Sequence, residues 1–383
     1  MVAIAGLVGL RPAPEHVARV VSPPYDVIKP GSPLEARLEA EPASAFHVIL
    51  GADPAAAIAR LRDQGFLAPD DEPAYYVYEQ RWADGSRTGV FLAVEVSDYA
   101  ERQIIRHEKT FDEKVKGRIA LAKQTGFNTG PVFLLAKDEL GRTLSEAKQD
   151  EPLYAFRSEY GGGTDLHGIE SRVWRVPAES PRGKAIAAAL APQRLYIADG
   201  HHRYHAALKG GQTHALAYVT DEAAILAYDR VVNGVVSFEE AKAKLDLAPA
   251  SSFHTPPKHV FRLYHRSGVF DLAAKQVPDD VVGRLDCAIL ERELYPQLGL
   301  THDHIVDPKH FDYYPESALG EMKAAVDRGD YELAIALHPV AREELMAVAD
   351  AGLEDPDVVM PEKSTFFSPK IHTGLFLYRH TYA

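Results

Sequence analysis

One short segment in the middle of the chain restricts the local backbone more than any other. The apolar residues 195–198 have the length and composition of a buried strand. Gly200 follows almost at once and permits a tight turn, and residues 201–208 have a helical pattern that ends at two glycines. We therefore expect the chain to turn directly from a strand into a helix at Asp199-Gly200.

Short strand-like and helix-like segments alternate irregularly along the rest of the chain. Residues 74–81 and 87–96 flank a turn that contains Gly85 and predict a β-hairpin. Residues 54–64 predict a helix with Asp53 as its N-cap. Short strands with mixed connections are typical of an α+β fold, and we expect a mixed β-sheet with flanking helices.

Charge and composition exclude several functional classes. The 42 Lys and Arg residues stand against 55 Asp and Glu, which gives a net charge of −13 and argues against nonspecific nucleic-acid binding. The single cysteine, Cys287, cannot form a disulfide within the chain and is interpreted as a buried filler thiol. No apolar run is long enough to span a bilayer, and the N-terminus lacks the basic start of a signal peptide. We expect a cytoplasmic protein that acts on small molecules, and we leave a homodimer open.

The turn at Asp199 has the residue types of a phosphate site. The free amides and the dipole of a helix N-terminus attract anions, and Arg203 can add a bidentate fork. His201 and His202 can donate to phosphoryl oxygens or relay protons. Asp199 would repel a bare phosphate, so we expect it to hold Mg²⁺ or a hydroxyl, or to orient a histidine. A plain helix cap beside surface histidines is the alternative.

Two other segments carry groups that suit phosphate chemistry. Glu108 stands between two potentially cationic residues and can be a general base or a metal ligand, or the end of a solvated strand with surface ion pairs. Arg118 follows ten residues later. The loop 360–370 supplies side chains that could wrap phosphate oxygens, although its composition also suits an ordinary loop; they are Lys363, Ser364, Thr365 and Lys370.

A third cluster resembles a set of metal ligands. If the backbone at His302-Asp303-His304 is extended, the two histidines point the same way and could bind one metal ion. Exposed loops also collect His and Asp, so a solvated loop is the alternative. A metal-dependent hydrolase therefore stays a minor alternative for the chain.

Four segments, in this order, match a family pattern. They are 22–27 (SPPYDV), 107–110 (HEKT), 197–204 (IADGHHRY) and 360–370 (MPEKSTFFSPK). The chain in this respect resembles a bacterial and archaeal family known as domain of unknown function 1015, over essentially its whole length. It departs from the family pattern at Gly117, where the family often has Asp, and at His205, where it often has Glu.

The Asp-Gly-His-His-Arg string also resembles the phosphate-handling motif of a wider group. That group contains the nucleotide-binding domain of the chromosome-partition protein ParB, sulfiredoxin and the free-serine kinases. The resemblance implies three regions: an N-terminal α/β region at 1–100, a ParB/sulfiredoxin-like phosphate-binding core at 101–235, and a C-terminal α/β region at 236–383 that closes the same site.

The resemblance also implies a small-molecule phosphotransferase that phosphorylates free L-serine or a similar hydroxyl compound. The donor would be ATP, ADP or pyrophosphate with Mg²⁺. Glu108, Asp199 and His201 would be catalytic, with Asp199 also on the metal. The donor phosphates would be held by Gly200, His202, Arg203, Arg118, Lys363, Ser364, Thr365 and Lys370. A nucleotide-binding switch with little catalysis is the main alternative.

Overall fold

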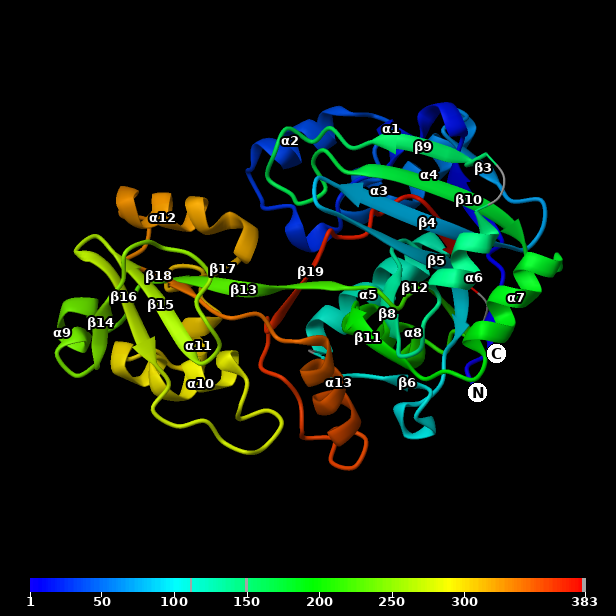
Figure 1. Ribbon diagram of the computed structural model, residues 1–383. Coiled ribbons are helices and arrows are strands. Elements are labelled where there is room, and N and C mark those ends of the chain that lie inside the picture. Colours follow the sequence, from blue (N-terminus) through cyan, green and yellow to red (C-terminus); the bar gives the residue numbers. More distant parts are fainter. Residues whose placement is uncertain (111, 149–150, 381–383) are drawn as a thin grey trace. The chain divides into compact units, whose positions relative to one another are not determined.

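The computed structural model describes residues 1–110, 112–148 and 151–380. The chain forms two compact units, each with its own sheet and helices (Figure 1). The first unit is Met1–Ala223 together with Pro369–Ala383, and the second is Ala224–Ser368. The final segment of the chain therefore belongs to the same unit as its beginning.

This division differs from the three regions expected at 1–100, 101–235 and 236–383. Strands from both sides of residue 100 pair in one sheet, because the hairpin of residues 74–95 lies beside strands that come later in the chain. The boundaries at residues 100 and 235 therefore stay a prediction.

A large mixed sheet forms the centre of the first unit. Among the described residues it has nine strands in the order β6-β11-β8-β12-β5-β4-β10-β9, with β1 beside β5. Their bounds are β1 Ile4–Ala5, β4 Ala74–Trp82, β5 Gly85–Glu95, β6 Ile104–Ile105, β8 Val132–Ala136, β9 Tyr154–Arg157, β10 Glu170–Pro177, β11 Leu195–Asp199 and β12 His214–Thr220.

Both kinds of pairing occur in this sheet, as the sequence predicts for an α+β fold. Strand β11 pairs parallel with β6 and antiparallel with β8, and β8 pairs parallel with β12. Strands β4 and β5 form the predicted hairpin, in register from Tyr76↔Phe91 to Trp82↔Gly85. Strand β8 is buried along its whole length, so apolar residues on both faces of the sheet contribute to the core.

A smaller sheet and eight helices complete the described part of the first unit. The small sheet has the order β3-β2-β20-β7, so the C-terminal strand pairs with one near the N-terminus. Asp53 caps α4 as predicted, accepting a hydrogen bond from the Ala56 amide at 3.0 Å. The bounds are β2 Gly9–Pro12, β3 Leu67–Pro69, β7 Phe127–Asn128 and β20 Leu377–Arg379; α1 Val17–Val20, α2 Pro33–Ala40, α3 Phe46–Ile49, α4 Pro54–Asp63, α5 Asp112–Thr125, α6 Gly141–Ala147, α7 Pro181–Leu190 and α8 His201–Lys209.

The second unit is an antiparallel sheet covered by helices on both faces. Its sheet has the order β14-β16-β15-β18-β13-β17, and β19 also pairs with β13. Helix α12 packs on the face that carries Val231 and Ala334, and α10 lies on the other side (Figure 1). The bounds are β13 Ala224–Val232, β14 Leu247–Pro249, β15 Val260–His265, β16 Gly268–Ala273, β17 Phe311–Pro315, β18 Leu333–Ala336 and β19 Thr365–Ser368; α9 Phe238–Lys242, α10 Asp286–Glu293, α11 His302–Ile305, α12 Leu319–Arg328 and α13 Arg342–Ala351.

The single cysteine and the helix lengths bear on two further expectations from composition. Cys287 lies on α10 and is buried, as predicted for a filler thiol, and burial raises its pKa to about 11. None of the helices in the described part of the chain is both long enough and apolar enough to cross a membrane.

Candidate functional site

The predicted strand-turn-helix is present in the first unit. Strand β11 ends at Asp199, Gly200 makes the turn, and α8 begins at His201. Gly200 has φ 96°, in the left-handed region that favours glycine, and a Cβ there would lie 2.9 Å from Arg203 Nε. The turn therefore needs glycine both for its backbone angle and for the close approach of the Arg203 side chain.

Two cationic side chains hold the Asp199 carboxylate. Arg203 Nη2 lies 3.0 Å from Oδ1, and Lys370 Nζ lies 2.8 Å from Oδ2. The same lysine nitrogen is 3.8 Å from Asp26 Oδ2. Arg203 and Lys370 therefore meet at one carboxylate, and Asp26 joins them from the N-terminal motif.

This arrangement does not fit a Mg²⁺ site at Asp199. Mg²⁺ takes oxygen ligands, and both carboxylate oxygens of Asp199 already contact cationic side chains. Among residues 1–110, 112–148 and 151–380, no three His, Cys, Asp or Glu side chains form a group that could hold a metal ion. We therefore derive no chemical step through a metal.

Glu108 and two buried histidines form a second part of the site. Glu108 Oε2 lies 3.5 Å from His201 Nδ1, and Glu108 Oε1 lies 3.9 Å from His107 Nε2. The two imidazole rings meet edge to face with their centroids 4.5 Å apart. Burial lowers the pKa of His107 to about 4 and that of His201 well below its usual value, so both rings are neutral near pH 7.

The tautomer of His201 follows from its neighbours. The His107 amide N–H points at His201 Nε2 over 3.5 Å, so Nε2 is the acceptor and Nδ1 carries the proton. That proton faces Glu108 Oε2. His201 is only 3% exposed, so it is suited to orienting Glu108 and not to contacting a ligand in solvent, whereas His202 is partly exposed.

Arg118 lies on α5, which packs against α8. Its guanidinium carbon lies 4.0 Å from the centroid of the Tyr25 ring, a cation–π contact. Burial lowers the pKa of Arg118, and the positive charge of Arg203 lowers it further, while Tyr25 and Asp26 oppose the shift. Two guanidinium groups are thus held near one another in a partly desolvated place.

A pocket of about 50 Å³ in the first unit is lined by both of these arginines. Because one water molecule needs about 10–15 Å³ of such volume, the pocket has room for a few waters or a group of similar size. Apolar side chains line part of it, together with three hydroxyl groups and two side-chain amides. The lining residues are Pro24, Tyr25, Ile49, Arg118, Leu121, Ala122, Phe127, Asn128, Thr129, Gly130, Arg203, Ala206, Ala207, Gln212 and Thr373.

The sequence analysis missed several of these lining residues as site residues. Tyr25 and its neighbour Asp26 belong to a motif that was quoted only for the resemblance, and residues 127–130 were not singled out from the sequence. Ser22 and Thr373 exchange backbone hydrogen bonds of 3.0 and 2.9 Å, which bring the Pro-Pro-Tyr-Asp segment to the end of the chain. Nothing in the local sequence signals this long-range pairing.

The other loop residues belong to the second unit. Lys363 has φ 58°, a left-handed angle that is uncommon outside glycine, and its Nζ lies 3.4 Å from Tyr228 Oη. Ser364 Oγ donates to the Pro361 carbonyl at 2.6 Å, and Thr365 begins β19. That Lys363, Ser364 and Thr365 complete the site at Arg203 stays a prediction.

The metal cluster expected at His302 rests on a wrong premise. Residues 302–305 form the short helix α11 and not an extended segment, so residues 302 and 304 point in different directions around the helix. His304 Nδ1 instead lies 2.9 Å from Oγ1 of Thr301, which is the N-cap residue of that helix.

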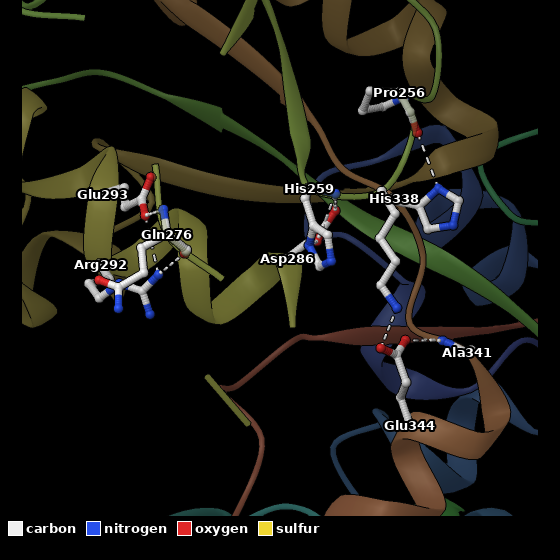
Figure 2. A network of polar contacts seen from close by, with 10 residues as sticks. Pro256, His259, Gln276, Asp286, Arg292, Glu293, His338, Ala341 and Glu344 are labelled. Carbon is white, nitrogen blue, oxygen red and sulfur yellow. Dashed lines mark hydrogen bonds and ion pairs between the residues drawn. The ribbon is translucent and has the colours of Figure 1, made fainter. Parts of the chain in front are cut away.

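A polar network in the second unit was not predicted either (Figure 2). The ring Nδ1 of His259 lies 2.9 Å from the buried Asp286 Oδ1, and the His259 amide donates to the same carboxylate. His338 Nδ1 bonds to the Pro256 carbonyl at 3.2 Å, and Lys258 pairs with Glu344. The contacts tie the segment before β15 to the starts of α10 and α13, which gives this network a structural role.

Comparisons with solved structures give distant likenesses only. A conserved hypothetical protein from Pyrococcus furiosus is 15% identical, with 76% of this chain and 94% of that chain covered and a TM-score of 0.37. A free serine kinase in complex with AMP is 14% identical, with 75% and 92% covered and a TM-score of 0.38. SbnI with a C-terminal truncation, from Staphylococcus aureus, is 13% identical, with 75% and 87% covered and a TM-score of 0.35. We draw no functional conclusion from likenesses at these TM-scores.

Comparison by sequence gives a family. No curated protein matches the chain. The family model described as "Protein of unknown function (DUF1015)" matches residues 4–288, which include three of the four motifs quoted above. Because this match spans well over half of the chain, the protein belongs to the DUF1015 family.

Proposed function

We propose that the protein is a small-molecule phosphotransferase whose donor phosphates bind in the first unit, at the start of α8. The observation that carries this proposal is that Arg118 and Arg203 line one pocket. Asp199 pairs with Arg203 and Asp26 acts on Arg118, and a phosphate in this pocket would bring further negative charge to both guanidinium groups. Guanidinium groups bind phosphate oxygens through paired N–H donors, and the amides after Gly200 add further donors.

The acceptor in this proposal is a hydroxyl compound such as free L-serine, and the donor is a nucleotide or pyrophosphate. The acceptor oxygen attacks the terminal phosphorus, the bond from phosphorus to the bridging oxygen breaks, and the shortened donor leaves with that oxygen. Glu108 accepts the proton that the acceptor hydroxyl loses. Arg118, Arg203 and Lys370 offset the negative charge of the phosphoryl group in the transition state.

His201 supports Glu108 as a positioning residue in this scheme. Its Nδ1–H faces Glu108 Oε2 over 3.5 Å, and its depressed pKa keeps the ring neutral, so it orients the carboxylate without neutralising it. Asp199 holds Arg203 and Lys370 in place through its two oxygens. The role of Asp199 is therefore to organise the cations of the site.

The test is transfer of phosphate to L-serine, followed by mass spectrometry, with ATP, ADP and pyrophosphate as separate donors. We expect Glu108→Gln to keep donor binding and to lower the transfer rate by about 10²-fold or more, the usual effect of removing a general base. Glu113→Gln changes an exposed carboxylate of α5 and should leave the rate unaltered. A wild-type protein that transfers phosphate from none of the three donors would overturn the proposal.

Donor binding can be tested separately from chemistry. We expect Arg203→Ala to weaken pyrophosphate binding by about 1.5–3 kcal/mol in calorimetry, the range for a hydrogen bond to a charged group. Arg203→Lys keeps the charge but loses the fork, so it should retain part of that affinity. Arg194→Ala removes an exposed arginine just before β11 and is the matched control. Equal affinity in wild type and Arg203→Ala would exclude this site for the phosphates.

A further inference from the structure

Arg230 on β13 is a fully buried cation in the second unit. Its Nε donates to Tyr295 Oη at 3.0 Å, and its Nη1 donates to the Tyr228 carbonyl. Within the described part of the chain, no acceptor lies within hydrogen-bond distance of Arg230 Nη2. An unsatisfied donor on a buried charge is unfavourable and rare in folded proteins, so it points to a missing partner.

Charged and phenolic side chains surround this guanidinium. Its carbon lies 5.4 Å from the centroid of the Tyr313 ring. Tyr313 is also within electrostatic range of Glu291, Glu362 and Lys363. Burial raises the pKa of Glu291, while the charge of Arg230 opposes this shift. The cluster thus combines two cations with two carboxylates, and the buried Asp229 beside Arg230 adds a third carboxyl group, whose pKa burial raises to about 7.

The segment that carries Lys363 is held in an uncommon conformation. Lys363 has φ 58°, and its Nζ lies 5.0 Å from the centroid of the Tyr228 ring. Tyr228 and Tyr313 meet edge to face, with their ring centroids 5.7 Å apart. Left-handed backbone at a residue other than glycine costs energy and is concentrated at ligand sites. The strained lysine contacts Tyr228, and the buried arginine contacts both the Tyr228 carbonyl and the ring of Tyr313.

We propose that Arg230 binds the carboxylate of a small zwitterionic molecule, a free amino acid, in the second unit. The planar guanidinium presents paired N–H donors that match the two oxygens of a carboxylate. An amino acid also adds no net charge to the buried cluster, because its carboxylate pairs with Arg230 and its ammonium group can pair with Glu291. Inorganic phosphate would instead add net negative charge beside the half-buried Glu291 carboxylate, which is costly in a desolvated place.

This site goes beyond the proposed phosphoryl transfer, since it lies in the second unit and requires only binding. It can be tested by thermal unfolding and calorimetry of the full chain, with glycine, L-serine, L-aspartate and L-lysine as separate probes and inorganic phosphate as a further arm. We expect at least one amino acid to raise the melting temperature of the wild type by a few degrees. We expect Arg230→Met to abolish that rise, and Arg230→Lys, which keeps the charge without the fork, to weaken the affinity by about tenfold or more.

Arg262→Met is the matched control for loss of a buried arginine in the same unit. Arg262 forms a bidentate pair with Asp271 at 2.8 and 2.9 Å, so its loss should lower the melting temperature and leave the response to the amino acid intact. Arg230→Met removes a cation that bonds to Tyr295 and Tyr228, so each ligand response is measured against the same variant without ligand, and Arg230→Lys decides the test if the Met variant does not fold. The proposal is overturned if no amino acid raises the melting temperature of the wild type, whether or not inorganic phosphate does so. It is also overturned if an amino acid still raises the melting temperature of Arg230→Met.

Discussion

Lys370 Nζ lies 2.8 Å from Asp199 Oδ2, which joins the end of the chain to the turn before α8. The backbone of the same lysine is also fixed: its N–H donates to Asp165 Oδ2, and its carbonyl accepts from Gln80 Nε2, each at 2.9 Å. Lys370 is 6% exposed, so these contacts are shielded from solvent. The candidate site of the first unit therefore depends on the segment after residue 368, although most of that unit comes before residue 224.

Replacing this lysine should destabilise the first unit. Lys370→Met keeps much of the side-chain volume but leaves Asp199 without one of its two cations. Breaking a buried ion pair costs about 3–5 kcal/mol, and Asp199 is partly exposed, so we expect a loss of about 2–3 kcal/mol in the free energy of unfolding. Urea unfolding, followed by circular dichroism, measures this change.

Lys116→Met is the control for the general loss of a lysine. Lys116 pairs with Glu113 on the exposed side of α5, and exposed pairs contribute at most about 1 kcal/mol. If the two variants lose equal stability, the contact between Lys370 and Asp199 has no special role in the fold.

Two glycines allow a matched test of the turn. Gly200→Ala places a Cβ on a residue with φ 96° and 2.9 Å from Arg203 Nε, so the turn and the arginine must shift. We expect a loss of about 1–3 kcal/mol in stability and weaker pyrophosphate binding. Gly117→Ala lies inside α5 with open space around its new Cβ, and should gain about 0.5–1 kcal/mol. Equal unfolding curves for wild type and Gly200→Ala would mean that the turn adapts without strain.

Local sequence patterns predicted the parts of the fold that depend on local physics. The β4–β5 hairpin, the Asp53 cap of α4 and the turn at Gly200 each need only a few adjacent residues to specify them. For the same reason α4 and α8 lie close to the helices predicted at 54–64 and from residue 201. The α+β class followed from the irregular order of these elements.

Contacts between distant segments could not be predicted in this way. The ion pair between Asp199 and Lys370 spans 171 positions, and the burial of His201 depends on His107 from another part of the chain. The final strand begins only at Leu377, and Thr373 before it pairs with Ser22 near the start of the chain. Sequence alone suggested which residues carry chemistry, and tertiary pairing decides which of them meet.

The buried histidines of the first unit should make its stability depend on pH. Burial lowers the pKa of His107 to about 4 and that of His372 to about 3, while an unfolded histidine titrates near about 6.5. Between these values the unfolded chain binds more protons than the folded chain, so stability is present in full above about pH 6.5 and falls as the pH drops. Each such histidine should contribute a slope of about 1.4 kcal/mol per pH unit in this window.

Urea unfolding at several pH values between about 7 and 5 measures this dependence of stability on pH. His107→Gln should lower the slope of stability against pH by the contribution of one histidine. His302→Gln, at an exposed position, should leave this slope unchanged. An identical slope in wild type and His107→Gln would show that His107 takes up its proton without unfolding.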